Sequence, residues 1–119
     1  GLVIGSELES GKVARANLHL VEAGLAQFAD VRAGNAIQTL RDTGGTIDML
    51  FLDGWKEMSL DVLQLTLGNL RRGSVVLADD LLLFPDLLAS YLDFVRNPAN
   101  GFVSVAIPLD DGIEYSVKL

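Results

Sequence analysis

The chain has 119 residues, half of them hydrophobic, which is enough for one compact domain with a core and too short for two. A formal net charge of −7 leaves no basic stripe to neutralise phosphates, so nucleic acid is not an expected partner. No apolar run reaches the roughly 18 residues of a membrane span, so a membrane is not an expected partner either. The absence of cysteine excludes disulfides and thiolate metal sites and fits a cytoplasmic protein.

Short apolar runs alternate with helical patterns along most of the chain. The predicted strands are Leu2–Ser6, Asp30–Ala33, Ile47–Leu52 and Ser74–Ala78. The predicted helices are Lys12–Ala23, Ala36–Arg41, a leucine-patterned stretch 60–70 and Asp86–Arg96. We expect Gly73 to form the turn before the fourth strand and Pro85 to start the last helix. This alternation predicts an α/β, Rossmann-like fold, in which a doubly wound, mostly parallel sheet is covered on both faces.

The carboxyl-terminal end follows a different pattern. Phe102–Ile107 and Ile113–Val117 are strand candidates, and the loop Pro108–Gly112 between them is short enough for a hairpin. The last strand should therefore be antiparallel. We see no linker, so residues 1–119 are expected to form a single domain.

Polar residues follow each of the first four predicted strands. They are Glu7, then Gly34 and Asn35, then Asp53, and finally Asp79 with Asp80. In a doubly wound sheet, ligands bind beyond the carboxyl ends of the strands. We therefore expect these residues at one edge of the sheet.

Three aspartates and two neighbouring residues are the candidates for chemistry. Asp53, Asp79 and Asp80 could form an all-oxygen site for Mg²⁺, Mn²⁺ or Ca²⁺, or each could instead cap a helix or bind loop amides. Lys56 could act as a general base, or be a solvated loop residue. Trp55 could stack on an adenine or wall off a substrate, and it could equally anchor the core.

Two stretches, 47–56 and 70–80, resemble the catechol and caffeoyl-CoA group of class I, S-adenosylmethionine-dependent O-methyltransferases in order and spacing. The likeness extends from Gly1 to the final hairpin. A receiver domain would need the acid pair before the single aspartate, and a haloacid-dehalogenase phosphatase would need an aspartate where Phe51 stands. Neither alternative fits the order of the residues.

The resemblance implies methyl transfer from S-adenosylmethionine to a hydroxyl of a small catechol-like or other phenolic acceptor. It implies Lys56 as the catalytic residue and a divalent cation, Mg²⁺ or another, as a second cofactor. The residues that it places at the cofactor are Glu7 on the ribose, Gly34, Asn35 and Ala36 near the adenine, and Asp53 and Trp55 beside cofactor and substrate. The residues that it places on the metal are Asp53, Asp79 and Asp80.

Two departures from the family pattern qualify these expectations. Asp80 stands where the family usually has asparagine, and the extra charge either strengthens cation binding or marks a lost metal geometry. The family's central first strand and its glycine-rich loop should precede Gly1. Without them, two strands would have unpaired edges unless they close up or borrow a strand, as in a homodimer. We then expect poor cofactor binding by the chain alone.

The alternative function is a non-catalytic binding or dimerising module.

Overall fold

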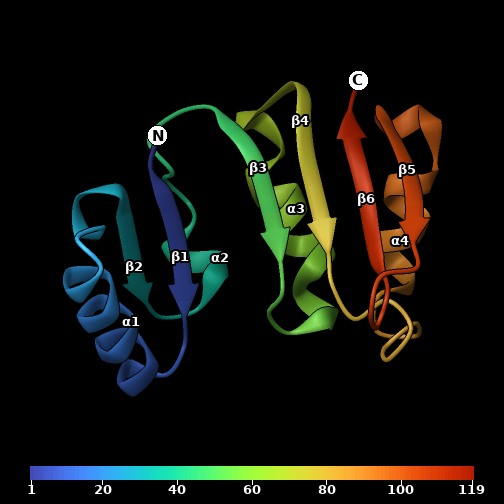
Figure 1. Ribbon diagram of the computed structural model, residues 1–119. Coiled ribbons are helices and arrows are strands. Elements are labelled where there is room, and N and C mark those ends of the chain that lie inside the picture. The colour runs from blue at the N-terminus through green and yellow to red at the C-terminus, as the bar shows by residue number, and fades with distance from the viewer. The chain divides into compact units, whose positions relative to one another are not determined.

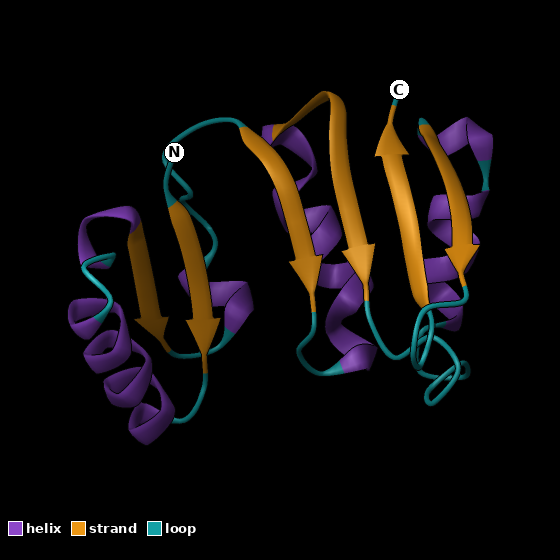
Figure 2. Cartoon of the chain, in the orientation of Figure 1, coloured by secondary structure: helices purple, strands orange, loops and turns teal.

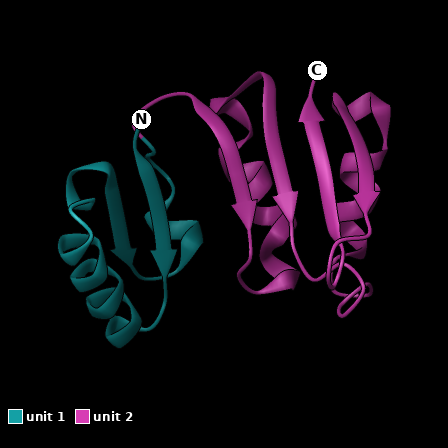
Figure 3. Ribbon diagram, viewed as in Figure 1, with its two compact units in different colours: residues 1–43 teal, residues 44–119 magenta.

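The computed structural model describes all residues from 1 to 119. They form two compact units, Gly1–Thr43 and Gly44–Leu119 (Figure 3). Each unit has a sheet of its own, with two strands in the first and four in the second. None of the helices has the length and apolar character needed to cross a membrane. That residues 1–119 form a single domain stays a prediction.

The first unit is a parallel strand pair with two helices (Figure 1). Its elements are β1 (Val3–Glu7), α1 (Ser10–Glu22), the 3-10 turn η1 (Ala26–Phe28), β2 (Ala29–Ala33) and α2 (Ala36–Thr39). The pairing runs from Val3 opposite Ala29 to Glu7 opposite Ala33. No side chain of this unit is fully buried, so the unit as described has no closed core.

The second unit contains a mixed four-stranded sheet of order β3-β4-β6-β5. Its strands are β3 (Ile47–Leu52), β4 (Leu70–Ala78), β5 (Phe102–Ile107) and β6 (Ile113–Lys118). Its helices are α3 (Ser59–Thr66) and α4 (Ala89–Arg96), with 3-10 turns η2 (Lys56–Met58), η3 (Leu67–Asn69) and η4 (Pro98–Asn100). Strand β3 is parallel to β4, and β6 is antiparallel to both β4 and β5. The predicted antiparallel last strand is confirmed.

One face of this sheet is packed and the other is open. Helices α3 and α4 lie on the same side of the sheet (Figure 2). The side chains buried between helices and sheet include Leu50, Leu52, Leu63, Val76, Ala78, Leu88, Tyr91, Val95 and Phe102. Alternate residues point the other way, because side chains along a strand alternate between faces. On that face Met49, Phe51, Val103 and Val105 are exposed.

The expectation of one sheet is wrong, because the chain has two. Within the second unit helices cover only one face, and the doubly wound arrangement with both faces covered stays a prediction. Strand β1 pairs only with β2, and β3 only with β4. The predicted unpaired strand edges are thus confirmed.

Two predicted boundaries are also wrong, and both errors have a local cause. Gly73 (φ +86°) lies inside β4, where the pairing register shifts between Ile47 and Met49, and does not precede the strand. The Ser74 hydroxyl closes this irregularity by donating to the Ile47 carbonyl oxygen and accepting from the Arg71 amide. Helix α4 begins at Ala89, because residues 81–88 form turns first.

A buried carboxylate ties α4 to the sheet. Glu114 on β6 is fully buried, and both its oxygens accept hydrogen bonds from Arg96 on α4, from Nε at 2.8 Å and from Nη2 at 2.6 Å. The Ser104 hydroxyl donates to the same carboxylate at 2.6 Å. Burial raises the pKa of Glu114, but the hydrogen bonds from Arg96 and Ser104 and the charge of Arg96 outweigh it, so its pKa lies below the ordinary 4.5.

This lowered pKa predicts a pH-dependent stability. Because the folded-state pKa lies below the unfolded-state value, the contribution of Glu114 is fully present above about pH 4.5 and is lost as the pH falls through the folded-state pKa. We expect Glu114→Gln to lower the free energy of unfolding by about 2 kcal/mol at pH 7, and the difference from wild type to shrink toward pH 3. Urea unfolding at a series of pH values measures both effects. The exposed Glu57→Gln is the matched control, and an equal loss at pH 7 in both variants would contradict the assignment.

Candidate active site

The candidate site begins where β3 and β4 end. Leu52 is paired with Ala78 in parallel register, so the residues after them, Asp53 and Asp79, leave the sheet side by side. The Asp79 amide still donates to the Leu52 carbonyl oxygen, at 3.1 Å, which extends the ladder by one residue. The parallel pairing thus brings the predicted aspartates to one edge, as the strand-end argument requires.

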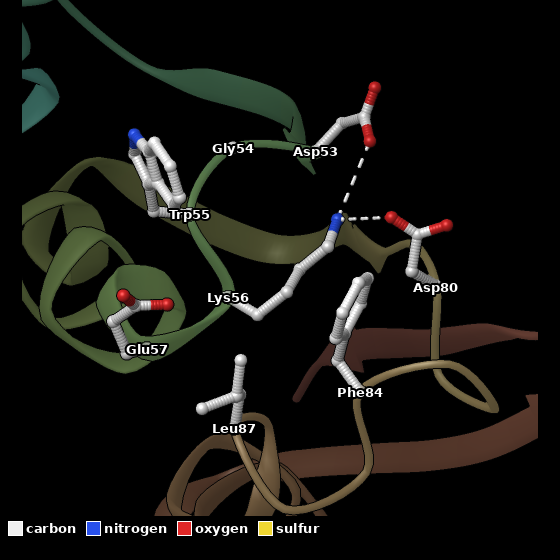
Figure 4. Close-up of a pocket in the computed structure, with 8 residues that line it drawn as sticks. All are labelled: Asp53, Gly54, Trp55, Lys56, Glu57, Asp80, Phe84 and Leu87. Atoms are coloured by element: carbon white, nitrogen blue, oxygen red, sulfur yellow. Dashed lines mark hydrogen bonds and ion pairs between the residues drawn. The ribbon is translucent and has the colours of Figure 1, made fainter.

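Lys56 turns back from η2 toward both strand ends. Its side chain is only 7% exposed, and its ammonium lies 2.8 Å from Asp80 Oδ2 and 3.5 Å from Asp53 Oδ1 (Figure 4). Asp80 is 27% exposed and Asp53 is 56% exposed, so the Asp80 pair is the closer and the better shielded from water. A buried ammonium is tolerated only when it is paired in this way.

The backbone at Asp80 has a left-handed conformation, with φ of +59°. Asp79 Oδ1 accepts a hydrogen bond from the Asp80 amide at 2.8 Å, and the Asp80 carbonyl oxygen accepts from the amides of Leu83 and Phe84. Aspartate and asparagine adopt this conformation more readily than most residues. The turn therefore aims the Asp80 carboxylate at Lys56 and starts the loop that follows.

An open pocket of about 320 Å³ surrounds this ion pair. It is lined by Asp53, Gly54, Trp55, Lys56, Glu57, Asp80, Phe84 and Leu87. Figure 4 shows Phe84 and Leu87 beside the aliphatic part of Lys56. Trp55 is exposed at the pocket wall, so its reading as a core anchor is wrong.

Sequence reasoning missed the apolar wall made by Phe84 and Leu87. A signal was present, since the run Leu81–Phe84 follows directly on the Asp79–Asp80 pair. A strand that ends at two aspartates cannot continue into the core, so apolar residues after them belong to the edge where the site lies.

The three aspartates as they stand do not fit a metal ion. No group of three or more histidine or carboxylate side chains lies close enough together to hold one. Asp53 and Asp80 both face Lys56, whereas one oxygen of Asp79 is used by the Asp80 amide. Metal ligation by Asp53, Asp79 and Asp80 stays a prediction.

The residues expected to bind adenosine lie in the first unit, and that unit brings them together. The Gly34 amide donates to the Glu7 carbonyl oxygen at 2.9 Å, so the end of β1 meets the loop after β2. Gly34 has φ of +133°, and a Cβ there would lie 3.2 Å from the Thr39 methyl carbon. Asn35 caps α2 by accepting from the Ile37 amide, and Ala36 is the first residue of that helix.

Comparison with known proteins agrees with this geometry. No protein-family model matches the chain. A catechol O-methyltransferase of Mycobacterium tuberculosis (strain ATCC 25618 / H37Rv) is 31% identical over 90 residues, which are 75% of this chain and 41% of that protein. The chain is similar to class I O-methyltransferases. It matches the S-adenosylmethionine-dependent catechol and caffeoyl-CoA group over part of its members' length.

Solved structures show the same fold. An O-methyltransferase of Bacillus cereus in complex with SAH is 19% identical with a TM-score of 0.85, covering 100% of this chain and 63% of that one. The cofactor-bound Rv0187 from MTB is 24% identical with a TM-score of 0.88, covering 99% and 62%. TomG from Streptomyces achromogenes in complex with SAM is 22% identical with a TM-score of 0.83, covering 99% and 62%. The chain thus spans about three fifths of these structures.

The Lys56–Asp80 pair predicts unequal effects of two otherwise identical substitutions. Asp80→Asn keeps a residue that adopts the left-handed conformation but removes the close counterion of a buried ammonium, so we expect a loss of about 2 kcal/mol in the free energy of unfolding. Asp53→Asn is the matched control, and because Asp53 is 56% exposed we expect a loss below about 0.5 kcal/mol. Urea unfolding of both variants tests this, and equal losses would contradict the shielding argument.

Proposed function

We propose that the full-length protein carrying this chain transfers the methyl group of S-adenosylmethionine to a hydroxyl of a small phenolic or catechol-like acceptor. The observation that carries the proposal is the buried Lys56 ammonium, held by Asp80 and Asp53 in a pocket where two parallel strands end. The catechol O-methyltransferase relative supports the reaction class, and the solved structures with SAM or SAH support the methyl donor. Residence in the cytoplasm stays a prediction.

The chemistry proposed for this chain is removal of the proton from the acceptor hydroxyl. S-adenosylmethionine supplies an electrophilic methyl group on its sulfonium sulfur. In the proposal, Lys56 as the free amine takes the proton of the acceptor hydroxyl and becomes the ammonium that Asp80 and Asp53 hold. The oxygen–carbon bond forms as the carbon–sulfur bond breaks, which gives a methyl ether and S-adenosylhomocysteine. A fixed ammonium also stabilises negative charge on the attacking oxygen before the methyl group arrives.

The adenosine part of the cofactor is assigned to the first unit. We propose that Glu7 binds the ribose hydroxyls and that Gly34, Asn35 and Ala36 contact the adenine. One Glu7 oxygen accepts from the Glu9 amide at 2.8 Å, which fixes the carboxylate and leaves its other oxygen for a hydroxyl. The contact between Gly34 and the Glu7 backbone supports a shared nucleoside site.

No step of this mechanism passes through a metal ion. Each of Asp53, Asp79 and Asp80 has one carboxylate oxygen outside these contacts, and the three would have to turn toward one ion beside the Lys56 ammonium. The positive charge of Lys56 opposes a cation there. A metal-assisted reaction therefore needs support beyond the side-chain positions described.

The proposal predicts that Lys56→Met abolishes most turnover without emptying the pocket. General acid–base catalysis contributes about 10²- to 10⁴-fold, so we expect methyl transfer to catechol to fall at least about 100-fold in the full-length protein. Mass spectrometry of the methyl ether and S-adenosylhomocysteine measures the rate. Arg72→Met removes one positive charge at the far end of β4 and should leave the rate within about twofold. Retention of wild-type activity by Lys56→Met would exclude Lys56 as the base.

The alternative function is a non-catalytic module that dimerises, and one observation favours it. Strand β3 has a free edge, and the exposed Met49 and Phe51 lie on its open face. An exposed apolar edge strand is a template for pairing with a second chain.

This alternative predicts a homodimer that dissociates in Phe51→Lys, as measured by light scattering after size-exclusion chromatography. The matched control is Leu18→Lys, on an exposed position of α1 in the other unit. Cofactor binding without turnover on any acceptor would support the module over the enzyme. A monomeric wild type at all accessible concentrations would exclude dimerisation through β3.

A further inference from the structure

The loop between β4 and α4 presents four large apolar side chains to solvent. Leu82, Leu83, Phe84 and Leu87, called here the apolar rim, are between 43% and 67% exposed. Phe84 and Leu87 also line the pocket at Lys56, so the rim is continuous with the candidate active site. Exposed apolar side chains gathered beside a pocket mark a binding surface more often than chance exposure does.

The rim is held in place by the rest of the unit. Leu81 and Leu88, which bracket it, are buried in the core. The Leu81 amide donates to the Gly112 carbonyl oxygen at 3.0 Å, and the Leu82 amide donates to the Asp111 carbonyl oxygen at 2.8 Å. The rim side chains are therefore exposed on an anchored loop whose backbone is bonded to the β5–β6 hairpin.

The charges around the pocket are mainly negative. Its lining has three carboxylates, those of Asp53, Glu57 and Asp80, and the single ammonium of Lys56, which two of them already bind. The other basic residues of this unit bind other groups or lie away from the pocket. Arg71 pairs with Asp48 and Arg96 pairs with Glu114. Lys118 donates to the Gly101 carbonyl oxygen, and Arg72 is near the start of β4. No cation of this unit is free at the rim to receive a carboxylate or phosphate.

We propose that the methyl acceptor is an uncharged phenol or catechol with an apolar substituent that lies on the rim, and that the site discriminates against anionic acceptors. This inference rests on the proposed function, because it takes the pocket at Lys56 as the acceptor site. The acidic lining repels a carboxylate or phosphate on the acceptor, and the rim shields an alkyl group from water. The same acidic surroundings disfavour an anionic lipid surface as the occupant.

The test uses Trp55, the one tryptophan of the chain, which lines the pocket and reports its occupancy by fluorescence. The chain is titrated with catechol, 4-butylcatechol and 3,4-dihydroxybenzoate. If the rim covers about half of the butyl group, 4-butylcatechol should bind about tenfold more tightly than catechol. The carboxylate of dihydroxybenzoate should weaken binding about tenfold at low salt, and less at high salt.

Variants assign the gain to the rim. The double substitution Leu83→Ser and Leu87→Ser should reduce the preference for 4-butylcatechol over catechol from about tenfold to about twofold. Leu18→Ser, at an exposed leucine of α1, is the matched control and should keep the full preference. An undiminished preference in the double variant would overturn the role of the rim.

The remaining outcomes separate this inference from the proposed function. Dihydroxybenzoate binding as tightly as 4-butylcatechol, or no response to any catechol, would overturn the inference. If 4-butylcatechol gave no fluorescence change, a change with phosphatidylcholine vesicles would assign the rim to a lipid surface. A change with protein concentration would then assign it to a second copy of the chain. Either result would overturn the inference. Selective binding of 4-butylcatechol without any methylated product from the full-length protein would uphold the inference and refute the methyl-transfer proposal.

Discussion

The parallel pairing of β3 with β4 is the constraint on which the candidate site depends. Because Leu52 and Ala78 are register partners, both strands release their next residues at the same edge, and the acidic groups of the two loops face one another. The carboxylates of Asp53 and Asp80 repel one another, and the Lys56 ammonium between them offsets that repulsion. The same carboxylates in turn make the burial of Lys56 tolerable. The strand register, the turn at Asp80 and the burial of Lys56 therefore depend on one another.

Asp80 has two roles, and they explain why aspartate at this position changes the site. Its left-handed backbone starts the loop that carries the apolar rim, a role that asparagine could also fill. Its carboxylate holds Lys56, a role for which the neutral amide of asparagine provides no charge. An extra carboxylate would strengthen a metal site only if it were available to the metal. Here one of its oxygens binds Lys56, so the added charge stabilises the buried ammonium.

The sequence predicted what depends on local pattern. Both bounds of β3 were predicted correctly because Ile47–Leu52 is apolar except for Asp48, and the antiparallel β6 followed from the short Pro108–Gly112 loop. The gathering of Asp53 and Asp79 also followed from strand order. The late start of α4 did not, because it depends on amides of Leu83 and Phe84 bonding to Asp80, and no residue type in that loop signals such a turn. The alternation of strands and helices predicted one sheet, because it does not specify which edges pair. Only the resemblance predicted the unpaired edges of β1 and β3.

Each group of proposed site residues is positioned by its own strand pair. The contact of Gly34 with Glu7 follows from β1 and β2, and the contact of Lys56 with Asp80 follows from β3 and β4. The acceptor chemistry therefore rests on contacts within the second unit, which has a buried core, whereas the nucleoside residues lie in a unit without a buried side chain. A ligand that binds only the folded state of a unit raises the free energy of unfolding of that unit. The size of that contribution depends on the ligand concentration relative to Kd and not on prior packing, so a nucleoside bound by Glu7 and Gly34 would add stability to a unit that has little burial of its own.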